Sequence, residues 1–447
     1  MDVAPWAGRM LHFIGIGGAG MSGLALVASR LGAAVSGSDS AETAYGGRLR
    51  ELGIEPVIGH GAANLPDGAE VVISTAIPDS NAELERARAR GARVLHRGDL
   101  LAELSRLKRC IAVSGTHGKT TTSAMAAHAL IACGHDPAYL VGGELRSTGV
   151  NAGWGGGEWI VVEADESDRS FLKLTPELAV ITNVELDHHA TYRSSLELER
   201  AFARFAAGAG RTSVWERVEL ALEGERETFG IEAGDLAARD VELVPLGSRF
   251  SVDGTPIELR VPGRHNVLNA LAALSACRVA GLEPPQAAAA MRDFSGAARR
   301  FEPRGTTRAG AAVYDDYAHH PTEVRATLEA ARTLGARRVV ACFQPHLYSR
   351  TALLAREFGA ALALADLVAV LEVYPARERA EDHPGVTGWL VAAAAADAAA
   401  GRPVYWVPKM ADAERLLASE LRAGDVLVTL GAGDVDRLAQ SLVVEPA

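Results

Sequence analysis

The sequence predicts an α/β protein with three domains built around parallel sheets, and three observations support this. Short runs of apolar and β-branched residues alternate with helical patterns along most of the chain. Glycine-rich turns at residues 15–20 and 115–118 each follow a strand-like run and precede a helical one. The chain has 447 residues, which is too long for a single hydrophobic core. We expect domains at residues 1–107, 108–300 and 301–447.

The bulk composition indicates a soluble globular protein, with 48% hydrophobic and 23% charged residues. The net charge of −11 argues against nucleic acid or an anionic membrane as the main partner, although local donors can still bind phosphates. The four cysteines are widely separated, which suits reduced thiols. The N-terminus does not resemble a signal peptide, and the longest apolar tract, residues 358–373, is too short to span a bilayer. We expect a cytoplasmic protein, without membrane insertion, that is a monomer or a weak homodimer.

The first segment carries a Gly-x-Gly-x-x-Gly turn between a strand at residues 11–16 and a helix at 21–31. Such a turn brings backbone N–H groups to a diphosphate, and Asp39, about 20 residues on, is placed to hold a ribose. By itself this pattern also fits an NAD-dependent dehydrogenase. The loops after residues 57–59 and 71–75 should lie at the same sheet edge. His60 lies in the first of these loops, and an ordinary surface position explains it equally well. The candidates for binding a nucleotide diphosphate are Gly15, Gly17, Gly18, Ala19, Gly20, Met21, Asp39, His60, Ser74 and Thr75.

The second segment follows a helical passage at residues 95–108 and begins with a strand that runs into Gly-Thr-His-Gly-Lys-Thr. This is a shortened P-loop, because Val113 stands where the standard pattern has its first glycine. Lys119 would supply a cation for the β- and γ-phosphates of ATP, and the Thr120 hydroxyl would bind Mg²⁺. The plainer alternative is a glycine-rich turn with a solvated lysine. The candidate ATP-binding residues of this loop are Gly115, Thr116, His117, Gly118, Lys119, Thr120 and Thr121.

Two later strands, at residues 159–163 and 178–182, should end at the same sheet edge as the P-loop. A Mg-ATP site needs a further ligand besides the P-loop hydroxyl, and Glu163 and His188 are the best candidates. Three more acids follow the first of these strands. For each of them a solvated acidic turn is the more ordinary interpretation. These acids are Asp165, Glu166 and Asp168.

An Ala-rich helix near residue 265 begins with a pair of asparagines. Asn266 and Asn269 are three residues apart and therefore share one helical face. Their amides either read an adenine or ribose or simply cap the helix.

The third segment has four polar loops that each follow a predicted strand and should therefore meet at one sheet edge. Adjacent histidines in a loop are rarely core residues. We therefore expect at least one of His319, His320 and His346 to contact a substrate. The loops span residues 315–320, 344–350, 374–378 and 431–434.

Together these motifs resemble the Mur ligase family. Each motif is weak alone, but as an ordered set that covers nearly the whole chain they are specific. The resemblance implies a Rossmann-like N-terminal domain for UDP, a central ATPase domain, and a C-terminal Rossmann-like domain for ATP and the amino-acid substrate. It also implies a UDP diphosphate, and no nicotinamide, at the first glycine turn. The resemblance rests on residues 12–23, 114–122, 163–168, 263–270, 315–323, 343–350 and 429–434.

The resemblance implies an ATP- and Mg²⁺-dependent ligase that joins the lactyl carboxylate of UDP-N-acetylmuramate to L-alanine through an acyl phosphate. It places Thr120, Glu163 and His188 at the metal. It places Asn266, Asn269 and Arg300 near the adenosine. The residues that it places near the muramyl carboxylate or alanine are Tyr317, His319, His346 and Arg350. The catalytic residues would be Lys119, His188, His319 and Arg350.

Two alternatives remain open from the sequence. A recycling ligase of the same family attaches a preformed tripeptide to UDP-N-acetylmuramate, but Tyr317 and the intact glycine loop favour the alanine-adding reaction. From a different class, the chain would be a nucleotide- or UDP-sugar-binding regulator without catalysis. The presence of Lys119, Glu163 and His188 argues against that alternative.

Overall fold

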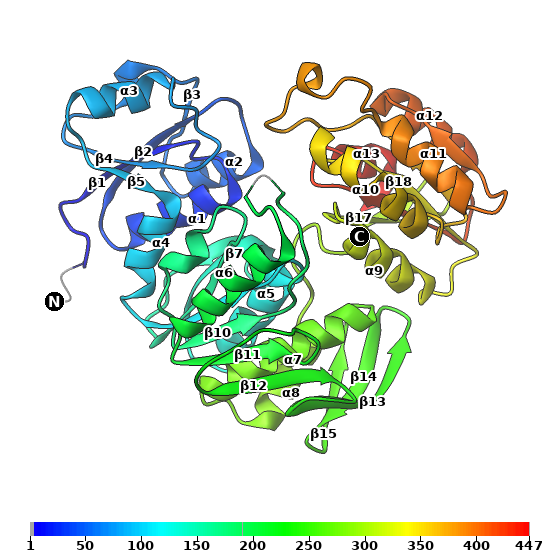
Figure 1. The fold of residues 1–447 in the computed structure, drawn as a ribbon, viewed down its shortest axis with the longest axis horizontal. Helices are drawn as coiled ribbons and strands as arrows, with labels where there is room; N and C mark the ends of the chain where they lie inside the picture. Colours follow the sequence, from blue (N-terminus) through cyan, green and yellow to red (C-terminus); the bar gives the residue numbers. More distant parts are fainter. Residues whose placement is uncertain (1–3, 190, 447) are drawn as a thin grey trace. The chain divides into compact units, whose positions relative to one another are not determined.

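A computed structural model describes residues 4–189 and 191–446 of the chain. It contains a five-stranded, a ten-stranded and a seven-stranded sheet with helices between the strands, which confirms the predicted α/β class with three domains (Figure 1). By internal contacts the chain divides into two compact units, residues 1–239, 252–255 and 268–294, and residues 240–251, 256–267 and 295–447. The boundaries expected after residues 107 and 300 stay predictions. Within the described ranges, no helix is both long and apolar enough to cross a bilayer.

The first sheet has the strand order β3-β2-β1-β4-β5, and all neighbouring strands are parallel. β1 is central, so the turn that follows it opens at the carboxyl edge of the sheet, where ligands bind in open α/β folds. The elements are β1 (Met10–Ile14), α1 (Ala19–Arg30), β2 (Ala34–Asp39), α2 (Ala44–Glu51), β3 (Val57–Ile58), β4 (Glu70–Ile73), α3 (Ala82–Ala89), β5 (Val94–His96) and α4 (Arg97–Ser105).

The expectation of a continuous helix over residues 95–108 is wrong at its start. β5 completes the sheet by pairing with β4, and α4 begins only at Arg97. His96 closes a capping box: its ring accepts the Gly98 N–H, and the Asp99 carboxylate accepts the His96 N–H. Arg97 therefore stands at the carboxyl end of a strand, at the same edge as the first glycine turn.

The central sheet has the order β15-β14-β13-β12-β11-β10-β6-β9-β7-β8. β6 lies between its parallel neighbours β10 and β9, so the loops after these three strands lie together. Residues 208–260, which carry no motif, supply β11 to β15. The elements are β6 (Arg109–Ser114), α5 (Lys119–Ala132), β7 (Ala138–Leu145), β8 (Val150–Gly153), β9 (Trp159–Glu163), β10 (Leu178–Ile181), α6 (Ser195–Ala207), β11 (Arg211–Trp215), β12 (Arg226–Ile231), β13 (Leu236–Val244), β14 (Gly247–Val252), β15 (Thr255–Leu259), α7 (Arg264–Val279) and α8 (Pro284–Asp293).

The third sheet has the order β20-β19-β18-β21-β17-β16-β22, in which β17 to β21 are parallel. The loops after β17, β18, β19 and β21 therefore share one edge, as expected. The elements are β16 (Glu302–Thr307), β17 (Ala312–Asp316), α9 (Pro321–Arg332), β18 (Arg338–Phe343), α10 (Tyr348–Leu362), β19 (Leu367–Val370), α11 (Gly388–Ala398), β20 (Val404–Trp406), α12 (Met410–Glu420), β21 (Asp425–Leu430), α13 (Asp436–Leu442) and β22 (Val443–Pro446).

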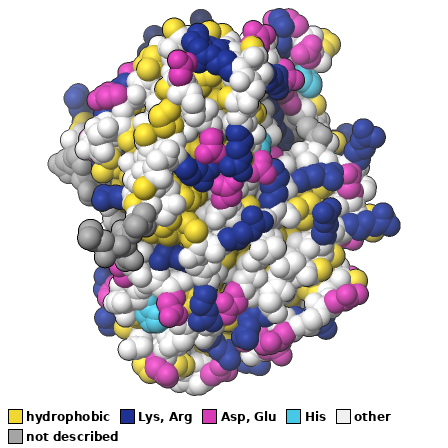
Figure 2. Space-filling model, turned by 90° about the vertical axis from the view of Figure 1, so that its left-hand side faces the viewer, with side chains coloured by type: hydrophobic (Ala, Val, Ile, Leu, Met, Phe, Trp, Pro, Cys, Tyr) yellow, Lys and Arg dark blue, Asp and Glu magenta, His cyan; other side chains and the backbone are white. Residues whose placement is uncertain are grey.

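Charged side chains of both signs are interspersed on the face drawn in Figure 2. Several ion pairs belong to the first sheet and its helices, such as Arg9 with Glu70 at 2.8 Å and Arg93 with Glu103 at 2.6 Å. Pairs as exposed as Arg93 and Glu103 contribute little to stability because water and salt screen them.

A buried polar network joins α3 to β1, β2 and the loop after β3 in the first domain. The Glu83 carboxylate, which is fully buried, contacts the His12 ring at 2.9 Å and accepts the Ser38 hydroxyl at 2.7 Å. It also accepts the Gly61 N–H and the Asn64 amide at 3.0 and 2.9 Å. Burial by itself raises the pKa of Glu83, but these donors outweigh it and lower the pKa to about 2. The network thus holds the loop after β3 against the strands.

Replacing Glu83 with glutamine should destabilise the protein by about 3 kcal/mol at pH 7, because it removes a buried carboxylate that accepts several hydrogen bonds. The folded-state pKa lies below the ordinary value of 4.5, so this contribution is complete above about pH 4.5 and is lost as the pH falls toward 2. Urea unfolding at pH 7, 5 and 3 measures this contribution. The rings of His12 and His60 also face the carboxylate. The exposed Glu85 on the same helix provides a Glu85→Gln control. Equal unfolding midpoints for both variants at pH 7 would contradict the prediction.

Candidate active site

The P-loop connects β6 to α5 through two glycines with positive φ. Gly115 has φ 131° and Gly118 has φ 83°, and a Cβ at Gly115 would overlap the Thr182 hydroxyl. The loop is held by residues that follow β10. The His117 N–H donates to the Asn183 side chain at 2.9 Å, and the Thr182 hydroxyl donates to the His117 carbonyl at 2.5 Å. Small residues are needed here because the neighbouring loop packs directly on the backbone.

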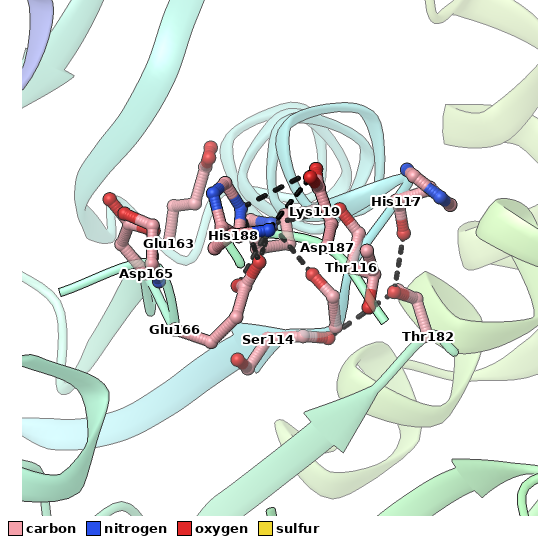
Figure 3. Close-up of polar contacts among 12 residues, drawn as sticks. Ser114, Thr116, His117, Lys119, Glu163, Asp165, Glu166, Thr182, Asp187 and His188 are labelled. Atoms are coloured by element: carbon pink, nitrogen blue, oxygen red, sulfur yellow. Dashed lines mark hydrogen bonds and ion pairs between the residues drawn. The ribbon is translucent and has the colours of Figure 1, made fainter. Parts of the chain in front are cut away.

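Lys119 is turned back over its own loop (Figure 3). Its ammonium group donates to the carbonyls of Gly115 and Thr116 at 2.6 and 3.1 Å and pairs with Glu166 at 2.9 Å. Burial disfavours the charged form, but the neighbouring carboxylates, Glu166 foremost, outweigh it and raise the pKa of Lys119 above its usual value. The lysine is therefore a permanent cation at the start of α5, and the solvated-lysine alternative is wrong.

The acidic residues after β9 are not a solvated turn. The Glu166 side chain is only 1% exposed and the Asp168 side chain 5%. Arg97 binds Asp165 at 2.6 Å and Asp168 at 2.7 Å. The Tyr192 hydroxyl donates to the Glu166 carbonyl at 2.8 Å. Sequence reasoning misses these partners because the helical pattern over residues 95–108 places Arg97 inside a helix. A polar residue directly after β5 is the signal that would have identified it.

The residues expected to bind Mg²⁺ fall into two groups. The Thr120 hydroxyl lies 3.2 Å from Glu163 Oε1, while Glu163 Oε2 accepts the Gly142 N–H at 2.7 Å. Two oxygens at this separation suit adjacent positions around Mg²⁺, where octahedral bonds of about 2.1 Å put neighbouring ligands about 3 Å apart. A hydroxyl and a carboxylate are also the oxygen ligands that this cation prefers. The pair therefore fits the metal.

His188 lies with Glu166 rather than with Glu163. Its Nε2 atom is 3.3 Å from Glu166 Oε1 and 3.8 Å from the Asp187 carboxylate. The backbone at His188 has φ 54°, and its N–H donates to Asp187 at 2.7 Å. This left-handed conformation turns the ring toward Lys119 and Glu166 (Figure 3). Whether His188 is a metal ligand stays a prediction.

The first glycine turn has a backbone that a ligand can approach closely. Gly15 has φ 80°, and the Gly17 N–H donates to the Asp39 carboxylate at 2.8 Å. Asp39 therefore supports the turn itself as well as standing at the end of β2. α1 begins after Gly18 with no side-chain cap, so the N–H groups of its first turn can donate to water or to an anion. A cavity of about 210 Å³ opens beside Ala19.

The remaining candidates of this domain differ in exposure. Met21 is buried in the core, whereas Thr75 and His60 are exposed and Ser74 is half-buried. The His60 ring contacts the Ser38 hydroxyl at 2.9 Å, which ties it to the Glu83 network.

The two asparagines of α7 both make contacts that organise the helix. Asn269 accepts the Thr122 hydroxyl at 3.3 Å, and a Cβ at Gly118 would meet its amide. The Asn266 amide donates to the Pro262 carbonyl at 2.7 Å. Both side chains are buried. Their role at the adenosine stays a prediction.

The third sheet edge brings four candidates together. The rings of Tyr317 and His319 are 5.3 Å apart, those of His319 and His346 5.8 Å. Arg350 Nη1 lies 3.4 Å from His346 Nδ1, and the Arg300 guanidinium lies 5.3 Å from the Tyr317 ring. Burial, with His319 and Arg350 adding to it, lowers the pKa of His346 to about 3. His346 is therefore neutral at physiological pH, as an acceptor or donor beside a cationic side chain.

The expectation that neither adjacent histidine is a core residue is wrong for His320, which is only 3% exposed. Its ring accepts the Thr322 N–H at 3.4 Å and caps α9, which begins at Pro321. His319 is half-buried and donates through its backbone to Glu323 at 3.0 Å.

Three family models match the chain in order along its length. The Mur ligase family catalytic domain matches residues 10–109, the Mur ligase middle domain matches residues 113–277, and the Mur ligase glutamate ligase domain matches residues 299–433.

Similar individual proteins cover almost the whole chain. It is 46% identical to the UDP-N-acetylmuramate–L-alanine ligase of Acidithiobacillus ferrooxidans over 453 residues, which is 96% of each chain. It resembles the solved structure of the UDP-N-acetylmuramate–alanine ligase from Thermotoga maritima with a TM-score of 0.85 and 31% identity, covering 97% of this chain and 98% of that one. A murein peptide ligase from Psychrobacter arcticus has a TM-score of 0.73 at 24% identity over the same shares, a likeness of fold alone.

Proposed function

The chain belongs to the Mur ligase family, and we propose that it is an ATP-dependent ligase that joins L-alanine to the lactyl carboxylate of UDP-N-acetylmuramate. The observation that carries this proposal is 46% identity to a ligase of that name over 96% of both chains. The product is a precursor of peptidoglycan. A dehydrogenase would leave the P-loop without a function. A solved ligase that joins UDP-N-acetylmuramate to L-alanyl-γ-D-glutamyl-meso-diaminopimelate is only 28% identical and covers 64% of this chain.

The reaction proceeds in two displacements. A lactyl carboxylate oxygen attacks the γ-phosphorus of ATP, and the bond to the bridging oxygen breaks to release ADP. The neutral amine of alanine then attacks the acyl carbon, loses a proton, and expels inorganic phosphate. Activation is required because a carboxylate is a poor acyl donor at neutral pH. Negative charge builds up in both steps, so cations must provide much of the stabilisation.

Lys119 supplies the cation at the phosphates. In the ligand-free chain it donates to its own loop carbonyls, which a phosphate oxygen would replace. The loop itself, from Gly115 to Thr121, holds the phosphates through backbone N–H groups. Mg²⁺ would neutralise phosphate charge when bound, held by Thr120 and Glu163, with His188 and Glu166 beside Lys119.

Residues outside the P-loop supply the remaining binding groups. Tyr317, His319, His346 and Arg350 bind the muramyl carboxylate or alanine, because a buried guanidinium next to neutral imidazole suits an anionic group. Asn266, Asn269 and Arg300 bind the adenosine. We assign the UDP moiety to the first glycine turn, its diphosphate at the start of α1.

Location and assembly are parts of the same proposal. All four cysteines are free, and burial raises the pKa of Cys110, Cys277 and Cys342 to about 12. Unreactive thiols of this kind suit the reducing cytoplasm. We propose a cytoplasmic monomer or weak homodimer.

The test is phosphate release from Mg-ATP and UDP-N-acetylmuramate with L-alanine, with the tripeptide L-alanyl-γ-D-glutamyl-meso-diaminopimelate, and with no amine. We expect release that depends on L-alanine. Release only with the tripeptide would assign the chain to the recycling reaction. UDP-sugar binding without release for any amine would support the regulator instead.

A further inference from the structure

A cavity of about 210 Å³ lies within the first compact unit, between the start of α1 and the end of β9. Its lining includes Ala19 and Gly20 from the first glycine turn and Glu163 and Asp165 from the acidic loop. Arg97 also lines it. The cavity therefore connects the turn that we assign to the UDP diphosphate with the loop that we assign to phosphoryl transfer.

Arg97 is held along one edge of its guanidinium group. Its Nε atom donates to Asp168 at 3.1 Å, and its Nη2 atom donates to Asp165 and Asp168 at 2.6 and 2.7 Å. A guanidinium has five N–H donors in one plane. The contacts with both aspartates use the Nε and Nη2 side, so the Nη1 amino group takes no part in them.

The Nη1 side of Arg97 faces the start of α1. A Cβ atom placed on Gly20 would lie 3.3 Å from Arg97 Nη1, which is the nearest atom from outside the first turns of α1. Gly20 belongs to the first turn of α1, whose N-cap residue, Gly18, supplies no side-chain cap. A guanidinium edge and the N–H groups of a helix start thus lie side by side along the cavity, and both favour an anion.

Charged groups of both signs surround Arg97. Asp165 and Asp168 face Arg97, but Asp165 also interacts with the Lys119 cation. Burial disfavours the charged guanidinium, and the two aspartates outweigh it and raise the pKa of Arg97. The arginine is therefore charged at every pH at which the protein is folded.

We propose that Arg97 binds the diphosphate of the UDP-sugar through Nη1, together with the first turn of α1, while Asp165 and Asp168 orient its guanidinium. This inference rests on the proposed function, and it adds a residue from α4 to a site otherwise built from the glycine turn. Because the same arginine holds the acidic loop, diphosphate binding also fixes the segment that follows Glu163.

The experiment is isothermal titration calorimetry with UDP-N-acetylmuramate, UDP, uridine and Mg-ADP, without alanine. In Arg97→Gln the affinities for UDP-N-acetylmuramate and UDP should fall by about 10- to 100-fold, which is the range expected for a lost hydrogen bond to a charged group. The affinities for uridine and Mg-ADP should change by less than about twofold, because neither is assigned contacts with Arg97. Arg93→Gln is the matched control, since Arg93 is exposed and pairs with Glu70 and Glu103.

Two further variants keep the inference testable if Arg97→Gln fails to fold. Gly20→Ala leaves the aspartate contacts in place but puts a methyl group 3.3 Å from Nη1, and it should weaken UDP binding without weakening uridine binding. Asp168→Asn keeps the arginine but loosens its orientation, and it should give a smaller loss for UDP.

Unchanged affinity for UDP in a folded Arg97→Gln variant would overturn the inference. A lower melting temperature with unchanged affinity would overturn it too, because Arg97 would then only join α4 to the acidic loop. The proposed function is tested separately, by alanine-dependent turnover of the unmodified enzyme. If that turnover is present while Arg97→Gln binds UDP normally, only the role of Arg97 fails.

Discussion

Replacing Lys119 with alanine should reduce alanine-dependent phosphate release by at least about 10³-fold in kcat/KM. Such a loss corresponds to about 4 kcal/mol of transition-state stabilisation, which is typical for a charged group that acts on a developing charge. The reason is that Lys119 is the cation at the start of α5, and its ammonium group is held over the loop carbonyls of Gly115 and Thr116. Steady-state phosphate release at saturating Mg-ATP measures the effect.

The same substitution also leaves Glu166 without its lysine partner, and that carboxylate is only 1% exposed. A loss of activity through unfolding must therefore be separated from a loss of chemistry. The double variant Lys119→Ala, Glu166→Gln removes the buried unpaired charge and should recover most of the melting temperature but none of the activity. Lys173→Ala is the matched control, because the Lys173 side chain is 40% exposed and pairs with the Asp99 side chain, which is also 40% exposed. Activity within tenfold of the unmodified enzyme in Lys119→Ala would contradict the assignment.

Replacing Glu163 with glutamine should raise the Mg²⁺ concentration needed for half-maximal activity by about 10- to 100-fold. Glu163 provides one of two oxygens 3.2 Å apart. Glutamine removes the negative charge and keeps only one oxygen, so an NH2 group takes the place of the oxygen beside Thr120. The substituted side chain can still accept the Gly142 N–H through its amide oxygen, so the loop should keep its position. Phosphate release as a function of Mg²⁺ concentration measures the change.

Calorimetry provides a second measurement that does not depend on turnover. The affinity for ADP in the presence of Mg²⁺ should fall in Glu163→Gln, whereas the affinity for ADP in EDTA should not. Glu158→Gln is the control, because Glu158 precedes the same strand and is 80% exposed. An unchanged Mg²⁺ requirement in Glu163→Gln would remove this residue from the metal site.

Much of the fold followed from local patterns. The strand at residues 159–163 is β9 as expected, and α9 begins at Pro321 as its position predicted. The turns after β1 and β6 lie at strand-to-helix junctions because glycines there reach φ values of 80° and 131°. These features depend on neighbours in the sequence, so a sequence suffices to predict them.

The errors concern side chains whose partners lie far along the chain. Glu166 was expected in solvent but is buried against Lys119, 47 residues away. His320 was expected outside the core, but it is buried and caps α9. Arg97 was expected in a helix interior, whereas the pairing of β5 with β4 moves the helix start and places it against Asp165, 68 residues on.

The sequence by itself determined the α/β class, the two glycine-rich turns and the family resemblance, because periodicity and short motifs are local properties of the chain. The tertiary structure decided which acids are buried, that Thr120 meets Glu163 while His188 meets Glu166, and that Arg97 faces the start of α1. Those contacts arise where the carboxyl ends of different strands meet at one sheet edge. Whether a charge is buried, and which partner it has, depends on how these strand ends come together, and no local sequence pattern encodes that arrangement.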